Sequence, residues 1–180
     1  GTAVADEHLA ELNVDTELAL TTDYRFRGIS QTDEEPAVQG GMTVGHSTGV
    51  YAGVWASSMQ SGAELDYFAG FNFDLASVSL GAEYRMYDYT GKYAVDPDYE
   101  EWSVTASAMG ASVGVIYSDD YSGTGAEYTR YGAAYNLPVG PLMLHAHAGL
   151  NDFDQPYMSL YGEDQYVDYE VAASMNVVDN

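Results

Sequence analysis

The feature that most constrains the fold is a strict alternation of charged and uncharged residues over strand-length runs. Between Leu12 and Gly28 the even positions carry no charged residue, and all five charged residues lie at odd positions. A period of two places the two sets on opposite faces of a β-strand. One face is therefore largely apolar, and the other presents Asp15, Glu17, Asp23, Arg25 and Arg27.

The same alternation recurs along the chain and predicts an all-β fold with an antiparallel up-and-down sheet of about ten strands. We expect one domain over residues 1–180, with residues 1–10 as an N-terminal extension. The expected strands cover residues 11–30, 37–47, 50–59, 63–74, 76–90, 100–109, 112–121, 126–137, 141–152 and 165–177.

Short and long connections alternate between these strands. Tight turns are expected at 47–49, 75, 110–111 and 137–141, and longer polar links at 31–36, 57–63, 90–100, 119–126 and 152–165. Tight turns on one rim and long loops on the other are typical of outer-membrane barrels. The sequence therefore predicts a transmembrane β-barrel, with a soluble β-sandwich as the alternative.

In the barrel, apolar side chains face lipid; in a sandwich they pack on a second sheet. The residues that distinguish the two are Leu18, Leu20, Val78, Leu80, Leu144 and Val171. Aromatic residues share the same parity and would form girdles at the membrane interfaces. These are mainly Tyr51, Trp55, Tyr67, Phe71, Phe73, Tyr84, Trp102, Tyr117, Tyr131, Tyr135 and Tyr169.

Composition excludes several classes of function. The formal net charge is −23, from 28 acidic and 5 basic residues, so the surface repels nucleic acid. There is no cysteine, which removes disulfides and thiolate chemistry. No catalytic motif stands out, so we expect neither an enzyme nor a cofactor.

Three segments resemble a known family. They are Asp23–Gln31 with Pro36–Gly41, Gly49–Ser57 and Tyr117–Tyr121, which are similar to the TorF-like porin family of proteobacteria. The resemblance implies an outer-membrane barrel with a transport role and does not identify a solute. Members of that family usually continue through one more hairpin to a terminal aromatic residue, whereas this sequence stops at Asn180. Either a final hairpin is missing, which would give 12 strands, or about ten strands close the barrel.

The arginines are the sharpest functional clue. Arg25, Arg27, Arg85 and Arg130 all lie on the polar parity, near the ends of their strands that adjoin the long loops. Carboxylates share that level and face, namely Asp23, Glu64, Asp66, Glu83, Glu101 and Asp168. We expect a mixed-charge layer across the lumen that sets ion preference and favours cations, because acids outnumber arginines. The alternative is that these pairs hold a narrow interior together without an open pore.

His145 and His147 are two residues apart on one polar face, a spacing that could present two imidazoles to a metal ion. No third ligand is evident, so we interpret them as solvated lumen histidines and predict no metal site.

The leading hypothesis is an outer-membrane, porin-like channel at the cell surface of a bacterium, passing small solutes or cations without chemistry. Its partners would be outer-membrane lipid and the solutes or ions themselves. The second hypothesis is a structural or surface-assembly protein, a homo-oligomer whose strand edges pair between subunits. A third, a soluble ligand-binding β-barrel, would need no detergent.

Overall fold

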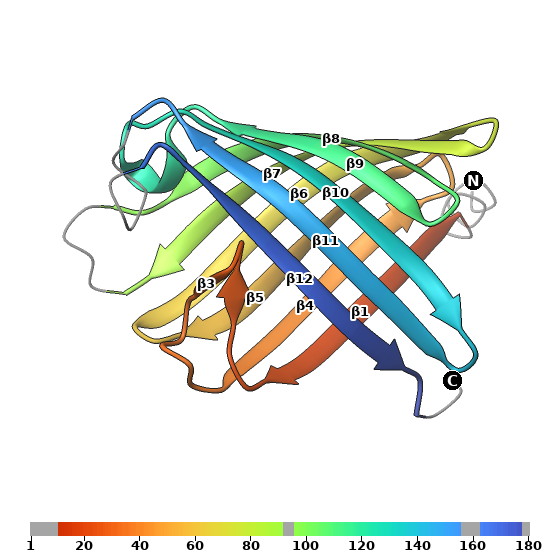
Figure 1. The fold of residues 1–180 in the computed structure, drawn as a ribbon, viewed down its shortest axis with the longest axis horizontal. Coiled ribbons are helices and arrows are strands. Elements are labelled where there is room, and N and C mark those ends of the chain that lie inside the picture. Colours follow the sequence, from red (N-terminus) through yellow and green to blue (C-terminus); the bar gives the residue numbers. More distant parts are fainter. Residues whose placement is uncertain (1–10, 92–95, 156–162, 178–180) are drawn as a thin grey trace, which may run out of the picture.

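The protein is built on one antiparallel sheet, seen in a computed structural model that describes residues 11–91, 96–155 and 163–177. The sheet has ten strands in the order β1-β4-β5-β6-β7-β8-β9-β10-β11-β12 (Figure 1). This confirms the predicted all-β fold and antiparallel topology. The strands are β1 (Leu12–Thr21), β4 (Ala37–His46), β5 (Val50–Met59), β6 (Gly62–Leu75), β7 (Val78–Thr90), β8 (Tyr99–Ala108), β9 (Ala111–Ser118), β10 (Tyr128–Val139), β11 (Leu142–Phe153) and β12 (Gln165–Met175).

The sheet coils around a central interior but is not closed by hydrogen bonds. Within the described residues, β1 pairs only with β4 and β12 pairs only with β11. Both strands are therefore edges, and their unpaired backbone groups remain available for a further strand.

The outer face of the sheet is apolar and uncovered. Leu18 and Val171 are 82% and 83% exposed, and Leu20 and Leu144 are also exposed, whereas Val78 and Leu80 are half-buried. The second sheet of the described structure has only two strands and lies on the inner side, so no protein layer packs on these groups. This arrangement is not that of a β-sandwich.

The aromatic residues do not all share that outer face. Trp102 and Tyr169 are exposed as expected. Tyr51 and Trp55 face inward instead, which corrects their assignment to a girdle. The hydroxyl of Tyr51 donates to Glu83 Oε2 at 2.9 Å, and the Trp55 ring lies 5.6 Å from that of Tyr24 inside the coiled sheet.

The connections follow the predicted asymmetry with one exception. Those at one end are short, covering residues 47–49, 76–77, 109–110 and 140–141, and three at the other end span residues 91–98, 119–127 and 154–164. The predicted polar link at 57–63 is wrong. β5 and β6 continue through it to a two-residue turn, because Ser57 is an inward-facing strand residue, nearly fully buried.

The largest correction concerns residues 11–30, predicted as one strand. β1 ends at Thr21, and a hairpin of β2 (Arg25–Phe26) and β3 (Ile29–Ser30) follows. Its two-residue turn is Arg27-Gly28, with φ of 51° and 83°. Positive φ at both positions defines the type I′ turn that matches the twist of a hairpin. Figure 1 shows this hairpin projecting into the interior of the coiled sheet.

The buried side chains of the described chain are confined to one end. The buried side chains lie in the halves of the strands next to the long connections, or in those connections. We call this region the loop-side interior and the opposite half the turn-side interior. A 3-10 helical turn, η1 (Tyr121–Gly123), covers part of the loop-side interior.

No helix in the described ranges is long and apolar enough to cross a bilayer. The predicted N-terminal extension, residues 1–10, lies outside the described residues.

Candidate functional site

The β2–β3 hairpin spans the interior and contacts three strands of the sheet. The Tyr24 hydroxyl donates to Glu64 Oε1 of β6 at 2.8 Å. The Arg27 guanidinium donates through both terminal nitrogens to the two carboxylate oxygens of Glu101 on β8, each at 2.6 Å. A Cβ at Gly28 would lie 3.3 Å from Cβ of Asp168 on β12. The hairpin is therefore held in place across the interior of the coiled sheet rather than lying along one strand.

Arg27 and Glu101 form the most enclosed ion pair of the interior. Their side chains are 7% and 4% exposed. The Arg27 guanidinium also lies over the rings of Phe26 at 4.4 Å and Tyr128 at 4.9 Å. The Tyr87 hydroxyl donates to the same carboxylate at 2.9 Å. The bidentate ion pair and the contacts with aromatic rings offset the cost of holding the guanidinium charge away from water.

A second ion-pair cluster surrounds Arg85 on β7. Its Nη1 lies 2.8 Å from Asp66 Oδ2 and its Nη2 lies 2.9 Å from Glu83 Oε1. Glu64 is two residues from Asp66 on the same inward face, and both are almost fully buried. The cluster thus joins one guanidinium to a group of three carboxyl side chains.

A third ion-pair cluster surrounds Asp168 on β12. It accepts hydrogen bonds from Arg130 Nη2 at 2.9 Å, Asn151 Nδ2 at 2.7 Å and His147 Nε2 at 2.6 Å. A Cβ at Gly149 would lie only 2.2 Å from Arg130 Nη2. The glycine therefore provides the space that the guanidinium occupies.

Arg25 does not join this interior layer. Its side chain is 55% exposed, and Nε lies 2.6 Å from Asp23 Oδ2 at the base of the hairpin. The Ser30 hydroxyl donates to Asp23 Oδ1 at 2.6 Å, and this bond is the main reason that the pKa of Asp23 lies below its usual value. Asp23 and Arg25 were expected on the wall of the lumen, and both instead belong to the hairpin segment.

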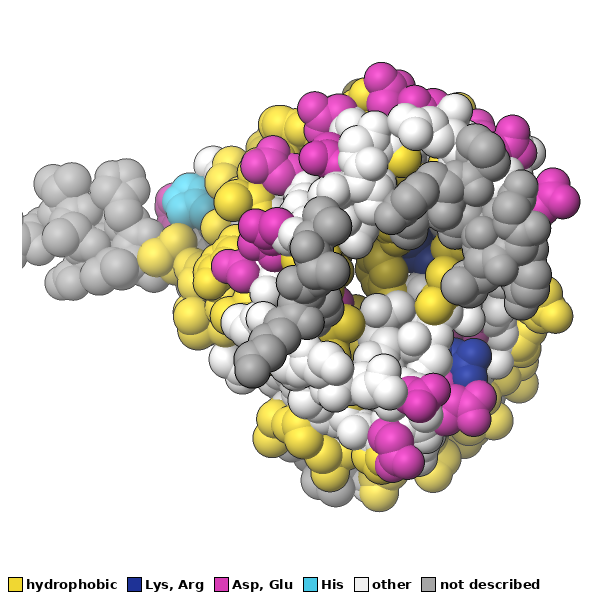
Figure 2. All heavy atoms as spheres, turned by 90° about the vertical axis from the view of Figure 1, so that its left-hand side faces the viewer, with side chains coloured by type: hydrophobic (Ala, Val, Ile, Leu, Met, Phe, Trp, Pro, Cys, Tyr) yellow, Lys and Arg dark blue, Asp and Glu magenta, His cyan; other side chains and the backbone are white. Residues whose placement is uncertain are grey.

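Aromatic rings close much of the loop-side interior around these pairs. Tyr87 and Tyr99 stack with ring centroids 4.4 Å apart, and Tyr121 of η1 lies 4.5 Å from Tyr128. Phe153 completes this buried cluster. Figure 2 looks onto this end and shows acidic side chains around its rim, with apolar and arginine side chains in the hollow between them.

The interior contains three hollows, two of which adjoin the ion-pair clusters of Arg85 and of Arg130 with Asp168. A cavity of about 900 Å³ is lined by Glu64, Asp66 and Arg85 and extends to β1 and to Glu170 of β12. A second, of about 430 Å³, is lined by Arg130, by both histidines of β11 and by small residues such as Thr105 and Ser112. A third, of about 330 Å³, lies at the tight-turn end, where Ser79 and Ser107 line it.

The structure thus brings Arg27, Arg85 and Arg130 together with Glu64, Asp66, Glu83, Glu101 and Asp168 in the loop-side interior. Sequence analysis missed the contribution of Tyr24, Asn151 and Tyr128, which bind these charged groups or lie against them. The inward parity of Asn151 and Tyr128 was readable, but no pattern indicated that the chain folds back after Thr21.

His145 and His147 lie on the inner face of β11, and their rings are 6.0 Å apart. A third potential ligand, Glu170, stands on β12 directly opposite His147.

Comparison with known proteins corrects the family. Residues 5–180 match the family described as bacterial protein of unknown function (Gcw_chp). The chain belongs to that family, and the expected membership of the TorF-like porin family is wrong, since no porin family matches. A search of the curated proteins gives no match.

Proposed function

We propose that this Gcw_chp protein is a β-barrel of the bacterial outer membrane that lets small cations cross through a narrowed interior, without chemistry of its own. The observation that carries the proposal is the contrast between the two faces of one sheet. Its outer face is apolar and uncovered, and its inner face carries the ion pairs and hydrogen bonds.

The outer face favours contact with hydrocarbon. Large apolar side chains are exposed on every strand of the sheet from β1 to β12, for example Val104 on β8 and Tyr131 on β10. Monomeric soluble proteins rarely expose a continuous apolar surface of this kind, and such a surface marks a membrane or protein contact. The strands have 8–14 residues, and a tilted transmembrane strand needs about 9–11.

Closure into a barrel is part of the proposal. Glu170 of β12 and Asp15 and Glu17 of β1 line the same cavity, so the two edge strands face each other across it. A sheet that coils this far leaves only its β1 and β12 edges to be joined. In a bilayer those edges must be paired, because unsatisfied backbone groups in hydrocarbon are costly.

Cation preference follows from the charges along the interior. The inner layer holds three guanidinium groups, Arg27, Arg85 and Arg130, and five carboxyl groups, Glu64, Asp66, Glu83, Glu101 and Asp168. The loop-side rim adds further acidic side chains (Figure 2). Rings of acidic groups attract cations into a pore and repel anions.

Conductance of the purified protein in planar lipid bilayers tests the proposal. We expect small, cation-selective steps, because the hairpin narrows the lumen. The double variant Glu64→Gln/Asp66→Asn should lower the preference for cations, whereas Asp74→Asn, at the opposite rim, should change it less. Absence of steps, or steps selective for anions, would contradict the proposed function.

The unpaired edges also favour a second candidate, a surface-assembly protein whose β1 and β12 edges pair between copies. Each edge strand has ten or more residues, and its backbone groups that point away from the sheet could bind a new strand of that length. Light scattering in detergent separates the candidates. Extended polymers support assembly, and a detergent-dependent monomer or small oligomer contradicts it. A protein that stays soluble without detergent would instead favour the ligand-binding alternative.

A further inference from the structure

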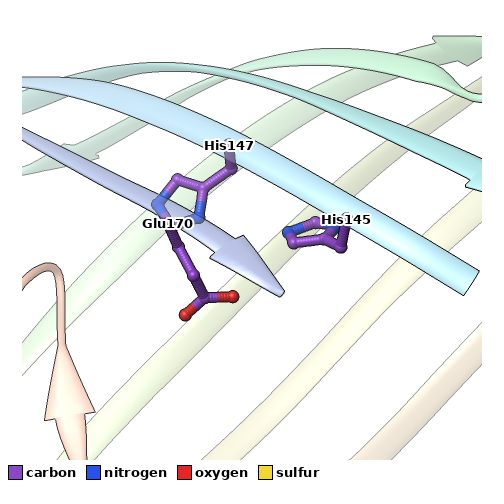
Figure 3. A group of neighbouring side chains, drawn as sticks. All are labelled: His145, His147 and Glu170. Carbon is purple, nitrogen blue, oxygen red and sulfur yellow. The ribbon is translucent and has the colours of Figure 1, made fainter. Parts of the chain in front are cut away.

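Two imidazoles and one carboxylate converge on the inner face of β11 and β12. His147 and Glu170 are register partners, and His145 lies two residues from His147 on the same face. One ligand atom from each residue lies within 4.8 Å of the other two. Figure 3 shows the three side chains grouped on the inner side of these strands. From this geometry we infer that His145, His147 and Glu170 bind a divalent transition-metal ion, for which Zn²⁺ is the appropriate probe.

The hydrogen bonds of the imidazoles leave one nitrogen of each free for a metal. His145 Nδ1 lies 2.7 Å from Asn136 Oδ1, and His147 Nε2 lies 2.6 Å from Asp168 Oδ1. Both oxygens accept, so these two nitrogens carry the protons. The lone pairs then reside on His145 Nε2 and His147 Nδ1.

This arrangement is the one that metal-ligating histidines usually have, with the second ring nitrogen donating to a carboxylate or another oxygen. Asp168 is itself fixed by Arg130 and Asn151, so it holds the His147 ring in one orientation. The site therefore has both its ligands and the groups that orient them.

Glu170 supplies the third ligand and is able to move. Its side chain is exposed, and within the described residues its carboxylate has no hydrogen bond or ion pair. Ligands at about 2.1 Å around tetrahedral zinc lie about 3.4 Å apart, so the 4.8 Å group must contract. Rotation of this unrestrained side chain can bring its carboxylate closer to both imidazoles.

The donor set and local charge select the class of ion. Two imidazoles and one carboxylate suit zinc and its neighbours in the transition series, whereas Ca²⁺ and Mg²⁺ prefer sites made of oxygen. Near the site, Glu170 and Asp168 bring two negative charges and Arg130 one positive charge. The excess negative charge favours a cation. The remaining coordination positions face the cavities, which leaves room for water or a solute.

The inference is independent of passage through the lumen, because it concerns binding alone. Isothermal titration of the purified full chain with zinc chloride, in detergent and with excess Mg²⁺ to occupy weak acidic sites, measures it. We expect one zinc ion per chain and a loss of that binding in His145→Ala/His147→Ala. Glu170→Gln should weaken binding, and Asn136→Leu should weaken it about 10-fold by releasing the His145 ring.

His46→Ala is the matched control, because His46 lies near Glu11 at the tight-turn end, away from this site. It should leave zinc binding unchanged, and circular dichroism should show all variants folded. No zinc binding by the wild type, or binding that the double histidine variant retains, would overturn the inference. Equal competition by Mg²⁺ would overturn the assignment to transition metals.

Discussion

The two halves of the interior are made by the same ten strands but are filled differently. In the loop-side interior, tyrosines, ion pairs and the β2–β3 hairpin fill the space, and Glu64, Tyr128 and Asn151 are almost completely buried. In the turn-side interior the inward residues around Ser79, Ser107 and Ser112 are small and polar, and a cavity remains there. The same backbone thus supports a packed half and a hollowed half, and side-chain size decides which forms.

The hairpin is the element whose removal should change this comparison most. Thr21 and Ala37 are register partners, so an Asn-Gly turn can replace residues 22–36 without altering the sheet. We expect a severalfold larger conductance step in planar bilayers, because the segment that crosses the lumen is gone. Replacing Gly140-Pro141 by Asn-Gly at the other end is the control and should leave conductance unchanged. An unchanged step in the first variant would show that the hairpin does not limit passage.

Arg27 and Arg25 allow a matched comparison of how a buried and an exposed ion pair stabilise the loop-side interior. Arg27→Ala should lower the free energy of unfolding by about 3–5 kcal/mol, because it leaves the Glu101 carboxylate buried without its partner. Arg25→Ala removes an exposed ion pair and should cost about 1 kcal/mol or less. Denaturant unfolding in detergent measures both. If both variants lost the same free energy of unfolding, the distinction between the buried tip of the hairpin and its exposed base would be wrong.

Removing a single hydroxyl should have a smaller effect on the free energy of unfolding, and this effect should differ between the two halves. Tyr128→Phe removes the hydroxyl that donates to Asn151 Oδ1 in a fully buried setting and should cost about 1–2 kcal/mol. Ser107→Ala in the turn-side interior should change the free energy of unfolding by less than about 0.5 kcal/mol. If Ser107→Ala were as destabilising as Tyr128→Phe, the turn-side interior would be packed and not hollow.

Much of the sheet was predictable because its signal is local. Each strand shows the alternation with a period of two, and turn residues lie between consecutive strands. The ten predicted ranges therefore match β1 and β4 to β12 closely at most ends. Inward parity also identified Arg27, Arg85 and Arg130 together with their carboxylate partners. These properties need no knowledge of which strands meet across the interior.

The features that the sequence did not predict depend on long-range contacts. The alternation continues through Thr22 and Asp23, so it gave no sign that the chain leaves the sheet after Thr21. Gly28 suits the second position of a type I′ turn, but Arg27 at the first position is unlike the usual Asn or Asp. Arg27 adopts its φ of 51° where its guanidinium is bound by Glu101, 74 residues away in the sequence. Glu170 was missed as a partner of the histidines because register across β11 and β12 is not visible in one strand.

The central claim is that hydrocarbon contacts the outer face of the coiled sheet. The chain has no cysteine, so single cysteines can be introduced and spin-labelled without background. In lipid vesicles, labels at Leu18, Val104 and Val171 should be accessible to oxygen and protected from a water-soluble nickel reagent. Labels at the inward positions Ser107 and Ser112 should show the reverse. Outward labels that are fully accessible to the nickel reagent would contradict the account.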